Sequence, residues 1–138
     1  MKPTLAVFAA ALWWGSLTTL GFLVVPLLFA WLPTPAMAGG VAARLFSAQC
    51  WVSLACGLLL LLLSRSKEPQ VLAGWAQGAI VFIVAGLLLA LLVEFGVAPR
   101  IVLRENLRLW HGVGSVMYLL QWLCAAVLLW RLARRTAA

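Results

Sequence analysis

The stretch from Val41 to Leu63 reads VAARLFSAQCWVSLACGLLLLLL and ends in six consecutive leucines, Leu58 to Leu63. A bilayer core about 30 Å thick is crossed by roughly 20 apolar residues in a helix. A membrane-spanning β-strand would instead alternate apolar and polar residues over about ten positions. Six leucines in a row exclude that alternation, so this stretch predicts a transmembrane helix.

Three further apolar runs of comparable length predict three more helices, at residues 5–32, 71–97 and 109–130. Apolar residues make up 66% of the chain and charged residues 9%, whereas soluble domains carry about 25% charged residues. We therefore expect an all-α integral membrane protein, a bundle of four transmembrane helices that forms one domain over residues 1–138.

Proline and glycine punctuate the connections between the runs. The first connection holds Pro33, Pro35, Gly39 and Gly40, the second is Ser64 to Gln70, and Ala98-Pro99 is expected to open the third. Pro26 falls inside the first run, where it removes one helix hydrogen bond and favours a kink. At 28 residues, the run 5–32 is longer than the 7 to 15 apolar residues of a signal peptide, so we expect it to be a retained helix.

Basic residues in the short flanking segments favour an orientation with both termini in the cytoplasm. In that orientation the inner side holds six basic residues against four outside; the six are Lys2, Arg65, Lys67, Arg131, Arg134 and Arg135. The net charge of +7 then predicts membrane lipids with anionic headgroups as partners, and no nucleic acid, since no soluble basic domain is present. We expect a multi-pass protein of the cytoplasmic (inner) membrane.

Tryptophans and small residues predict how the helices pack. Trp31, Trp75, Trp110 and Trp130 are expected at the membrane interfaces. Trp13, Trp14, Trp51 and Trp122 lie deeper and are expected to pack between helices; the alternative is that they line a hydrophobic substrate cavity. Small residues recur at four-residue spacing in the runs 5–32 and 71–97, which lets backbones approach closely; they are Ala11, Gly15 and Thr19, and Gly74, Gly78, Gly86 and Ala90. These rows predict contact faces, within the chain or in a homo-oligomer.

No catalytic, cofactor or metal motif is recognisable. The three cysteines, Cys50, Cys56 and Cys124, lie inside apolar runs without CxxC spacing, and the chain has one histidine. We expect buried, inert thiols, no metal, no cofactor and no catalytic residues. Because no nucleophile and base share a predicted face, the chain is not expected to be an enzyme.

Ionisable residues gather at the predicted external end of the bundle. If residues 100–111 are helical, Arg100, Arg104, Arg108 and His111 form one stripe, which Ser115 continues. Because ionisable groups at membrane depth usually face the bundle interior or water, we expect this stripe to point toward Glu94 and Arg44. The candidate ligand-binding residues are therefore Arg44, Glu94, Arg100, Arg104, Arg108, His111 and Ser115.

Three hypotheses compete for this cluster. Glu94 and Glu105 can neutralise two of the arginines and latch the helices together. The excess of arginine can instead bind an anionic lipid headgroup or a small anion, because the guanidinium fork suits carboxylate and phosphate. In the third hypothesis the protein is a proton-coupled transporter of a small solute or metal, or a subunit of one, in which Glu94 acts with His111.

Several short motifs resemble the transmembrane protein 205-like family, defined by a domain of unknown function numbered 4149. They are Gly21 to Phe29, Ala38 to Phe46, Ala98-Pro99-Arg100-Ile101 with Leu103-Arg104, and Trp110-His111-Gly112 with Ser115. The resemblance implies four membrane spans and no established reaction. It also implies characteristic polar positions at Arg44, Pro99, Arg104, His111 and Ser115. Leu109-Trp110 departs from the residues that usually precede the family's His-Gly pair.

Overall fold

The computed structural model describes residues 2–65 and 76–137. Within these ranges four helical rods are long and apolar enough to cross a membrane: Thr4–Trp31, Pro35–Leu63, Ile80–Val102 and Leu107–Arg135. The all-α membrane bundle that the sequence predicts is confirmed, and the protein is a multi-pass membrane protein.

Two of the four rods are built from several elements. The first rod comprises α1 (Lys2–Thr19), the π-helical turn η1 (Leu20–Val24) and α2 (Val25–Trp31). The third comprises α4 (Ile80–Leu92), the π-helical turn η2 (Val93–Val97) and α5 (Ala98–Val102). The second and fourth rods are single helices, α3 (Pro35–Leu63) and α6 (Leu107–Ala137).

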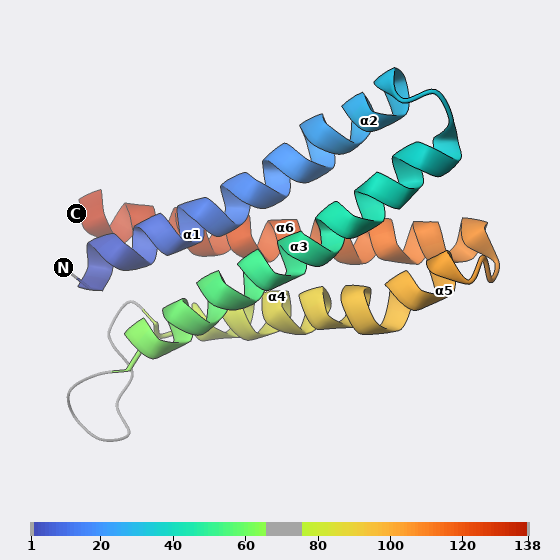
Figure 1. Cartoon of the computed structure of the whole chain (residues 1–138). Helices are drawn as coiled ribbons and strands as arrows, with labels where there is room; N and C mark the ends of the chain where they lie inside the picture. The colour runs from blue at the N-terminus through green and yellow to red at the C-terminus, as the bar shows by residue number, and fades with distance from the viewer. Residues whose placement is uncertain (1, 66–75, 138) are drawn as a thin grey trace.

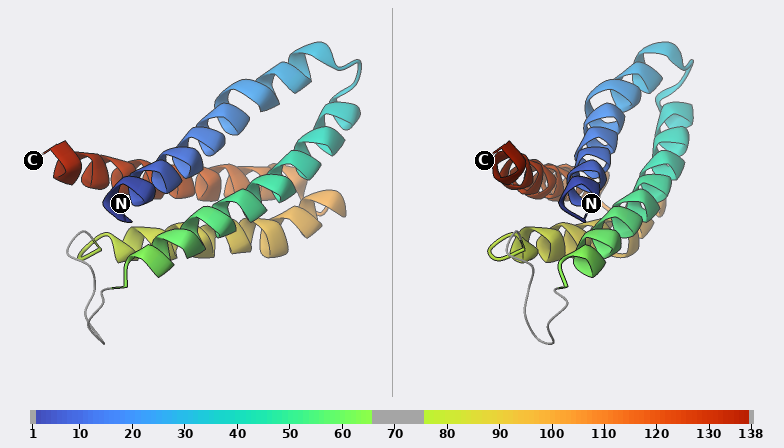
Figure 2. Two further views of the ribbon diagram at one scale, coloured as in Figure 1. Left: turned by 60° about the vertical axis from the view of Figure 1, so that its left-hand side comes forward. Right: turned by 90° about the vertical axis from the view of Figure 1, so that its left-hand side faces the viewer.

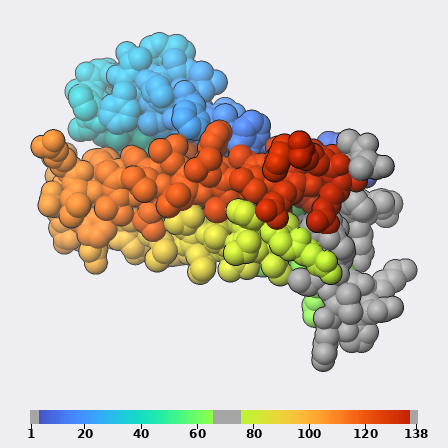
Figure 3. Space-filling model, turned by 180° about the vertical axis from the view of Figure 1, so that it is seen from behind, coloured from blue at the N-terminus to red at the C-terminus, as the bar shows by residue number. Residues whose placement is uncertain are grey.

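The helices form a closed ring in which α1 contacts α3 and α6, and α4 contacts the same two helices. Figure 1 shows the start of α1 and the end of α6 at one end of the bundle, with the 32–34 and 103–106 connections at the other. We call these the terminal end and the hairpin end. Toward the hairpin end, α2 and the start of α3 diverge from α5 and α6 (Figures 2 and 3).

The core of the terminal half is apolar and tightly packed. Trp13, Leu17, Leu60, Ile83 and Leu128 are fully buried. Glycines let the helices approach there: a Cβ on Gly86 would lie 2.8 Å from the Trp13 ring, and one on Gly57 would meet Leu87. Interhelical packing in lipid relies on such small residues.

The predicted boundaries hold at several helix ends and fail at others. The first rod ends at Trp31 and α3 ends at Leu63, as predicted within one residue. The prediction that α3 begins at Val41 is wrong, because Pro35 occupies its first turn and the Thr34 hydroxyl accepts a hydrogen bond from the Met37 N–H. Proline is well suited to a first turn, where its missing N–H has no helical partner anyway.

The third rod differs most from its prediction. Residues 71–75, which include Gly74 and Trp75, lie outside the described residues, and α4 begins at Ile80. Ala98-Pro99 does not open a connection, which corrects the prediction: the rod continues to Val102. The π-turn η2 accommodates Pro99, just as η1 precedes Pro26, since the wider turn removes the clash between the proline ring and the preceding carbonyl.

The packing predictions are confirmed in part. Trp13 is buried, and Trp14 and Trp122 contact each other with ring centroids 6.0 Å apart. Trp51 is 64% exposed and does not pack between helices, so that prediction is wrong. Gly78 lies in a turn with φ +74° outside the helix, and a Cβ on Gly15 would meet no atom within 4 Å in the described chain.

Candidate functional site

A layer of polar side chains crosses the bundle on the hairpin side of the apolar core. The Gln49 amide nitrogen donates to the Ser16 hydroxyl at 2.9 Å, and the Gln121 amide nitrogen donates to the Ser53 hydroxyl at 2.9 Å. Gln49 is roughly 21 Å along α3 from Pro35, which places it deep in the span. Because polar groups away from water need partners, this layer ties α1, α3 and α6 together.

Glu94 joins this layer from η2. Of the three acidic residues in the sequence, Glu94 alone lies inside a spanning helix of the described chain. The Ser47 hydroxyl of α3 contacts both carboxylate oxygens, at 2.8 and 3.0 Å. A carboxylate has about four acceptor positions, so one hydroxyl leaves most of its acceptor capacity unused.

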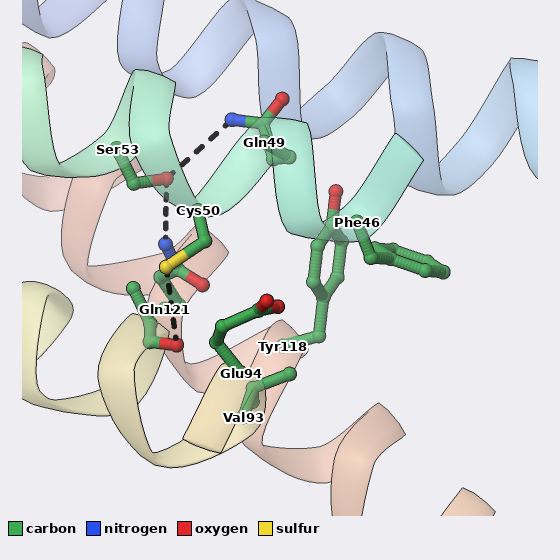
Figure 4. Close-up of a pocket in the computed structure, with 9 residues that line it drawn as sticks. Phe46, Gln49, Cys50, Ser53, Val93, Glu94, Tyr118 and Gln121 are labelled. Atoms are coloured by element: carbon green, nitrogen blue, oxygen red, sulfur yellow. Dashed lines mark hydrogen bonds between the residues drawn. The ribbon is translucent and has the colours of Figure 1, made fainter. Parts of the chain in front are cut away.

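A small cavity lies between Glu94 and the amide pair (Figure 4). Its volume of about 20 Å³ is room for one water molecule. The Cys50 thiol also borders it and donates to the Ala90 carbonyl at 3.7 Å. The lining residues come from α3, α4, η2 and α6; they are Phe46, Gln49, Cys50, Ser53, Ala90, Val93, Glu94, Tyr118 and Gln121.

Tyr118 and Phe46 form the side of the cavity nearest the hairpin end. Their rings make an edge-to-face contact with centroids 5.3 Å apart. The Tyr118 hydroxyl donates to the Leu17 carbonyl at 2.7 Å. A Cβ on Gly21, in η1, would lie 2.6 Å from the Tyr118 ring. The tyrosine therefore fits closely against the π-turn of the first rod.

The predicted arginine stripe does not form. Residues 103–106 make a turn in which Arg104 and Asn106 have positive φ, 57° and 35°, so the helix is broken between α5 and α6. The predicted approach of these side chains to Glu94 is also not found, since none of them lines the Glu94 cavity. The structure leaves six of the seven candidate residues exposed: Arg44, Arg100, Arg104, Arg108, His111 and Ser115. Since α2 diverges from α6 at this end (Figure 1), a polar face there can stay solvated.

Glu94 is consequently separate from the arginines. Among residues 2–65 and 76–137 no salt bridge joins Glu94 or Glu105 to an arginine, so the latch hypothesis is wrong in that form. Arg100 instead lies over the Trp110 ring at 4.4 Å from its centroid. His111 does not line the Glu94 cavity.

The described residues contain no group of three metal-ligating His, Cys, Asp or Glu side chains. Cys50, Cys56 and Cys124 are free thiols. Ser47, Gln49, Ser53 and Gln121 were not among the candidate residues. The sequence could have indicated two of these four residues. Gln49 and Ser53 are polar residues inside an apolar run, and their four-residue spacing places them on one helix face.

Fold and site together define a class: a four-helix multi-pass membrane protein in which a carboxylate inside a membrane span contacts a serine of a neighbouring helix. Within that class, the chain belongs to the family described as domain of unknown function 4149, whose model matches residues 8–109. The match includes Arg44, Glu94 and Arg104 but ends before His111 and Ser115. No curated protein and no solved structure matches the chain.

Proposed function

We propose that the protein is a small membrane transporter, or a subunit of one, in which Glu94 takes up a proton or a small hard cation. One observation carries this proposal: a carboxylate lies inside a membrane span without a basic partner in the described chain. A charge at membrane depth is costly unless it is neutralised. A proton or a cation neutralises the carboxylate and meets its unused acceptor positions.

The surroundings of Glu94 favour a small, hard ligand. The cavity beside it has room for one water molecule, and its polar atoms are mostly oxygens of carboxyl, hydroxyl and amide groups. Glu94 also lies in a π-turn, an element that often marks functional sites. His111 has no part in this proposal, and the role is non-enzymatic.

The orientation follows from the basic residues. With both termini in the cytoplasm of a cell whose inner membrane holds the protein, the Glu94 cavity lies nearer the outer face. Ligand then enters from outside and must cross the apolar terminal half to reach the cytoplasm. Transport accordingly requires a second conformation in which that half opens.

The test uses purified protein in liposomes that contain a pH-sensitive dye, with an imposed Na⁺ or K⁺ gradient. Wild-type protein is expected to move protons or cations, and Glu94→Gln is expected to abolish the movement. Glu105→Gln is the matched control, because Glu105 is exposed in the 103–106 turn. Equal activity in wild type and Glu94→Gln would exclude this function.

A second candidate function, binding of an anionic lipid headgroup, is favoured by a groove at Arg108. This groove is shallow and wide open, and all of its lining residues belong to α6; besides Arg108 they are Leu109, Gly112, Val113, Val116 and Met117. An acyl chain fits the apolar floor, and a phosphate fits the guanidinium. Native mass spectrometry should then show phosphatidylglycerol retained by wild type and Arg44→Gln but lost from Arg108→Gln; equal retention in all three would exclude this site.

A further inference from the structure

The Glu94 cavity has one polar approach along the bundle. On its terminal side the core contains Trp13, Leu60, Ile83 and Leu128, all fully buried. The hydrogen-bonding groups of the buried core cluster on that side are the Cys56 thiol and the Trp13 indole N–H, which has no hydrogen-bond partner in the described chain, so no continuous polar path runs through it. Water and ions therefore reach the inner residues from the hairpin end.

The Tyr118 and Phe46 rings lie between the Glu94 cavity and the hairpin end of the bundle. Phe46 lies about one helical turn nearer the hairpin end than Gln49 and Cys50, and Tyr118 lies about one turn nearer than Gln121. Gln49, Cys50, Ser53 and Gln121 are buried, whereas Phe46, Glu94 and Tyr118 are partly exposed. Figure 4 shows the Tyr118 ring beside the Glu94 carboxylate. The two rings thus close the hairpin-end side of the cavity that Glu94 and the two glutamine amides line.

The Tyr118 hydroxyl holds its ring in this place. It donates to the Leu17 carbonyl at 2.7 Å, a bond between α6 and α1. Gly21 provides the surface against which the ring rests, since a Cβ there would lie 2.6 Å from it. Moving the ring away requires that this hydrogen bond break.

We propose that Tyr118 is the gate of the Glu94 site: its hydroxyl, bonded to the Leu17 carbonyl, keeps the cavity closed, and release of that bond admits water or a small cation to Glu94 and the glutamine amides. The ligand that this gate would admit rests on the proposed function, whereas the contacts of Tyr118 that form the gate do not depend on it. Tyr118 is a positioning residue here and does not bind the ligand.

The native Cys50 thiol reports on the gate because it borders the cavity and is buried. In a Cys56→Ala, Cys124→Ala background, a small water-soluble methanethiosulfonate reagent is added to the protein in liposomes. The cavity has room for about one water molecule, so the reagent reaches Cys50 only when the site widens. The rate of Cys50 modification then measures opening.

Tyr118→Phe keeps the ring and removes the hydroxyl. It is expected to speed Cys50 modification about 3- to 10-fold, the change in equilibrium that one ordinary hydrogen bond produces. Gly21→Ala, which displaces the ring without altering Tyr118, is expected to speed it as well and serves as the second variant if Tyr118→Phe folds poorly.

Trp122→Phe is the matched control. It removes another hydrogen bond between α6 and α1, from the Trp122 indole N–H to the Thr18 hydroxyl at 2.8 Å, outside the cavity lining. Its modification rate should stay at the wild-type value. An unchanged rate in Tyr118→Phe, or an equal rise in Trp122→Phe, would overturn the gate.

The two proposals fail in different ways. If Glu94 binds no ion, Glu94→Gln and wild type move ions equally, while Tyr118→Phe still speeds Cys50 modification. If Tyr118 is not a gate, Cys50 modification is unchanged in Tyr118→Phe, while Glu94→Gln still abolishes ion movement.

Discussion

A single missing methyl group makes room on α4 for the Trp13 ring, which reaches across the bundle from α1. Gly86 faces the fully buried Trp13 ring, and an added Cβ would lie 2.8 Å from it. Gly15 is the contrasting case, because a Cβ there would meet nothing within 4 Å in the described chain. Glycine is thus needed for packing at position 86, whereas at position 15 the helix face is open.

Gly86→Ala is expected to destabilise the bundle by about 1 to 3 kcal/mol, since overpacking a tight core forces neighbouring atoms apart. Gly15→Ala should leave stability unchanged or raise it, because alanine favours helix and no contact opposes it. Unfolding by sodium dodecyl sulfate in mixed micelles measures both. Equal stability of the two variants would show that the Trp13 contact relaxes without cost.

Residue chemistry in the sequence identifies part of the site. Glu94 is recognisable because an acidic residue inside an apolar run is costly there. Its partner Ser47 is not recognisable, since a serine in such a run is unremarkable until the register of α3 against η2 is known. The spacing of Arg100, Arg104 and Arg108 predicts one helical stripe that faces Glu94, yet sequence does not show that a turn breaks this helix and leaves the arginines exposed.

At the scale of elements, the two π-turns place the functional side chains. Each precedes a proline by two residues: η1 ends at Val24 before Pro26, and η2 ends at Val97 before Pro99. A π-turn adds one residue to the helix, which changes the direction of the side chains on either side of it by about 100°. Glu94 faces Ser47 in this geometry.

Pro99→Ala is expected to let η2 relax toward an α-helix and turn Glu94 away from Ser47, while stability is kept or raised because proline is unfavourable in a helix. The readout is the infrared band of the Glu94 carboxyl group. Ser47→Ala should shift this band in the parent protein and leave it unchanged in the Pro99→Ala background.

Pro26→Ala is the control for the Pro99→Ala experiment, since Pro26 follows the π-turn of the first rod, which does not contain Glu94. It should preserve the effect of Ser47→Ala on the band. If Ser47→Ala shifts the band to the same extent with and without Pro99, the π-turn does not position Glu94.

Helix existence was predictable from length and hydropathy, but the interruptions were not. The break after α5 depends on Arg104 and Asn106 adopting positive φ. Asparagine does so readily, but arginine is uncommon there, so the local sequence favours the continuous helix that the prediction assumed. Pro35 and Pro99 predict breaks where the structure has helix. Proline begins a helix as readily as it ends one, and both residues lie in a first turn.

For the whole molecule, the arrangement of the four rods places the start of α1 and the end of α6 at one end (Figure 1). The sequence predicts that this end is cytoplasmic. In a cysteine-free background, Thr34→Cys should react with an impermeant maleimide added to intact cells, and Thr136→Cys only after the membrane is permeabilised. Labelling of Thr136→Cys in intact cells would reverse the orientation and place Arg104 and Arg108 inside.

The lengths of the rods also set how the protein fits its membrane. The apolar stretch of α3 from Val41 to Leu63 is about 35 Å long, which exceeds the roughly 30 Å of a typical hydrocarbon core. Hydrophobic mismatch of this kind is relieved by tilt, which decreases in a thicker bilayer. Ser47 belongs to α3 and Glu94 to a different rod, so a change in the tilt of α3 displaces one against the other. We therefore expect that lipids of longer or shorter chain alter the contact between Ser47 and Glu94.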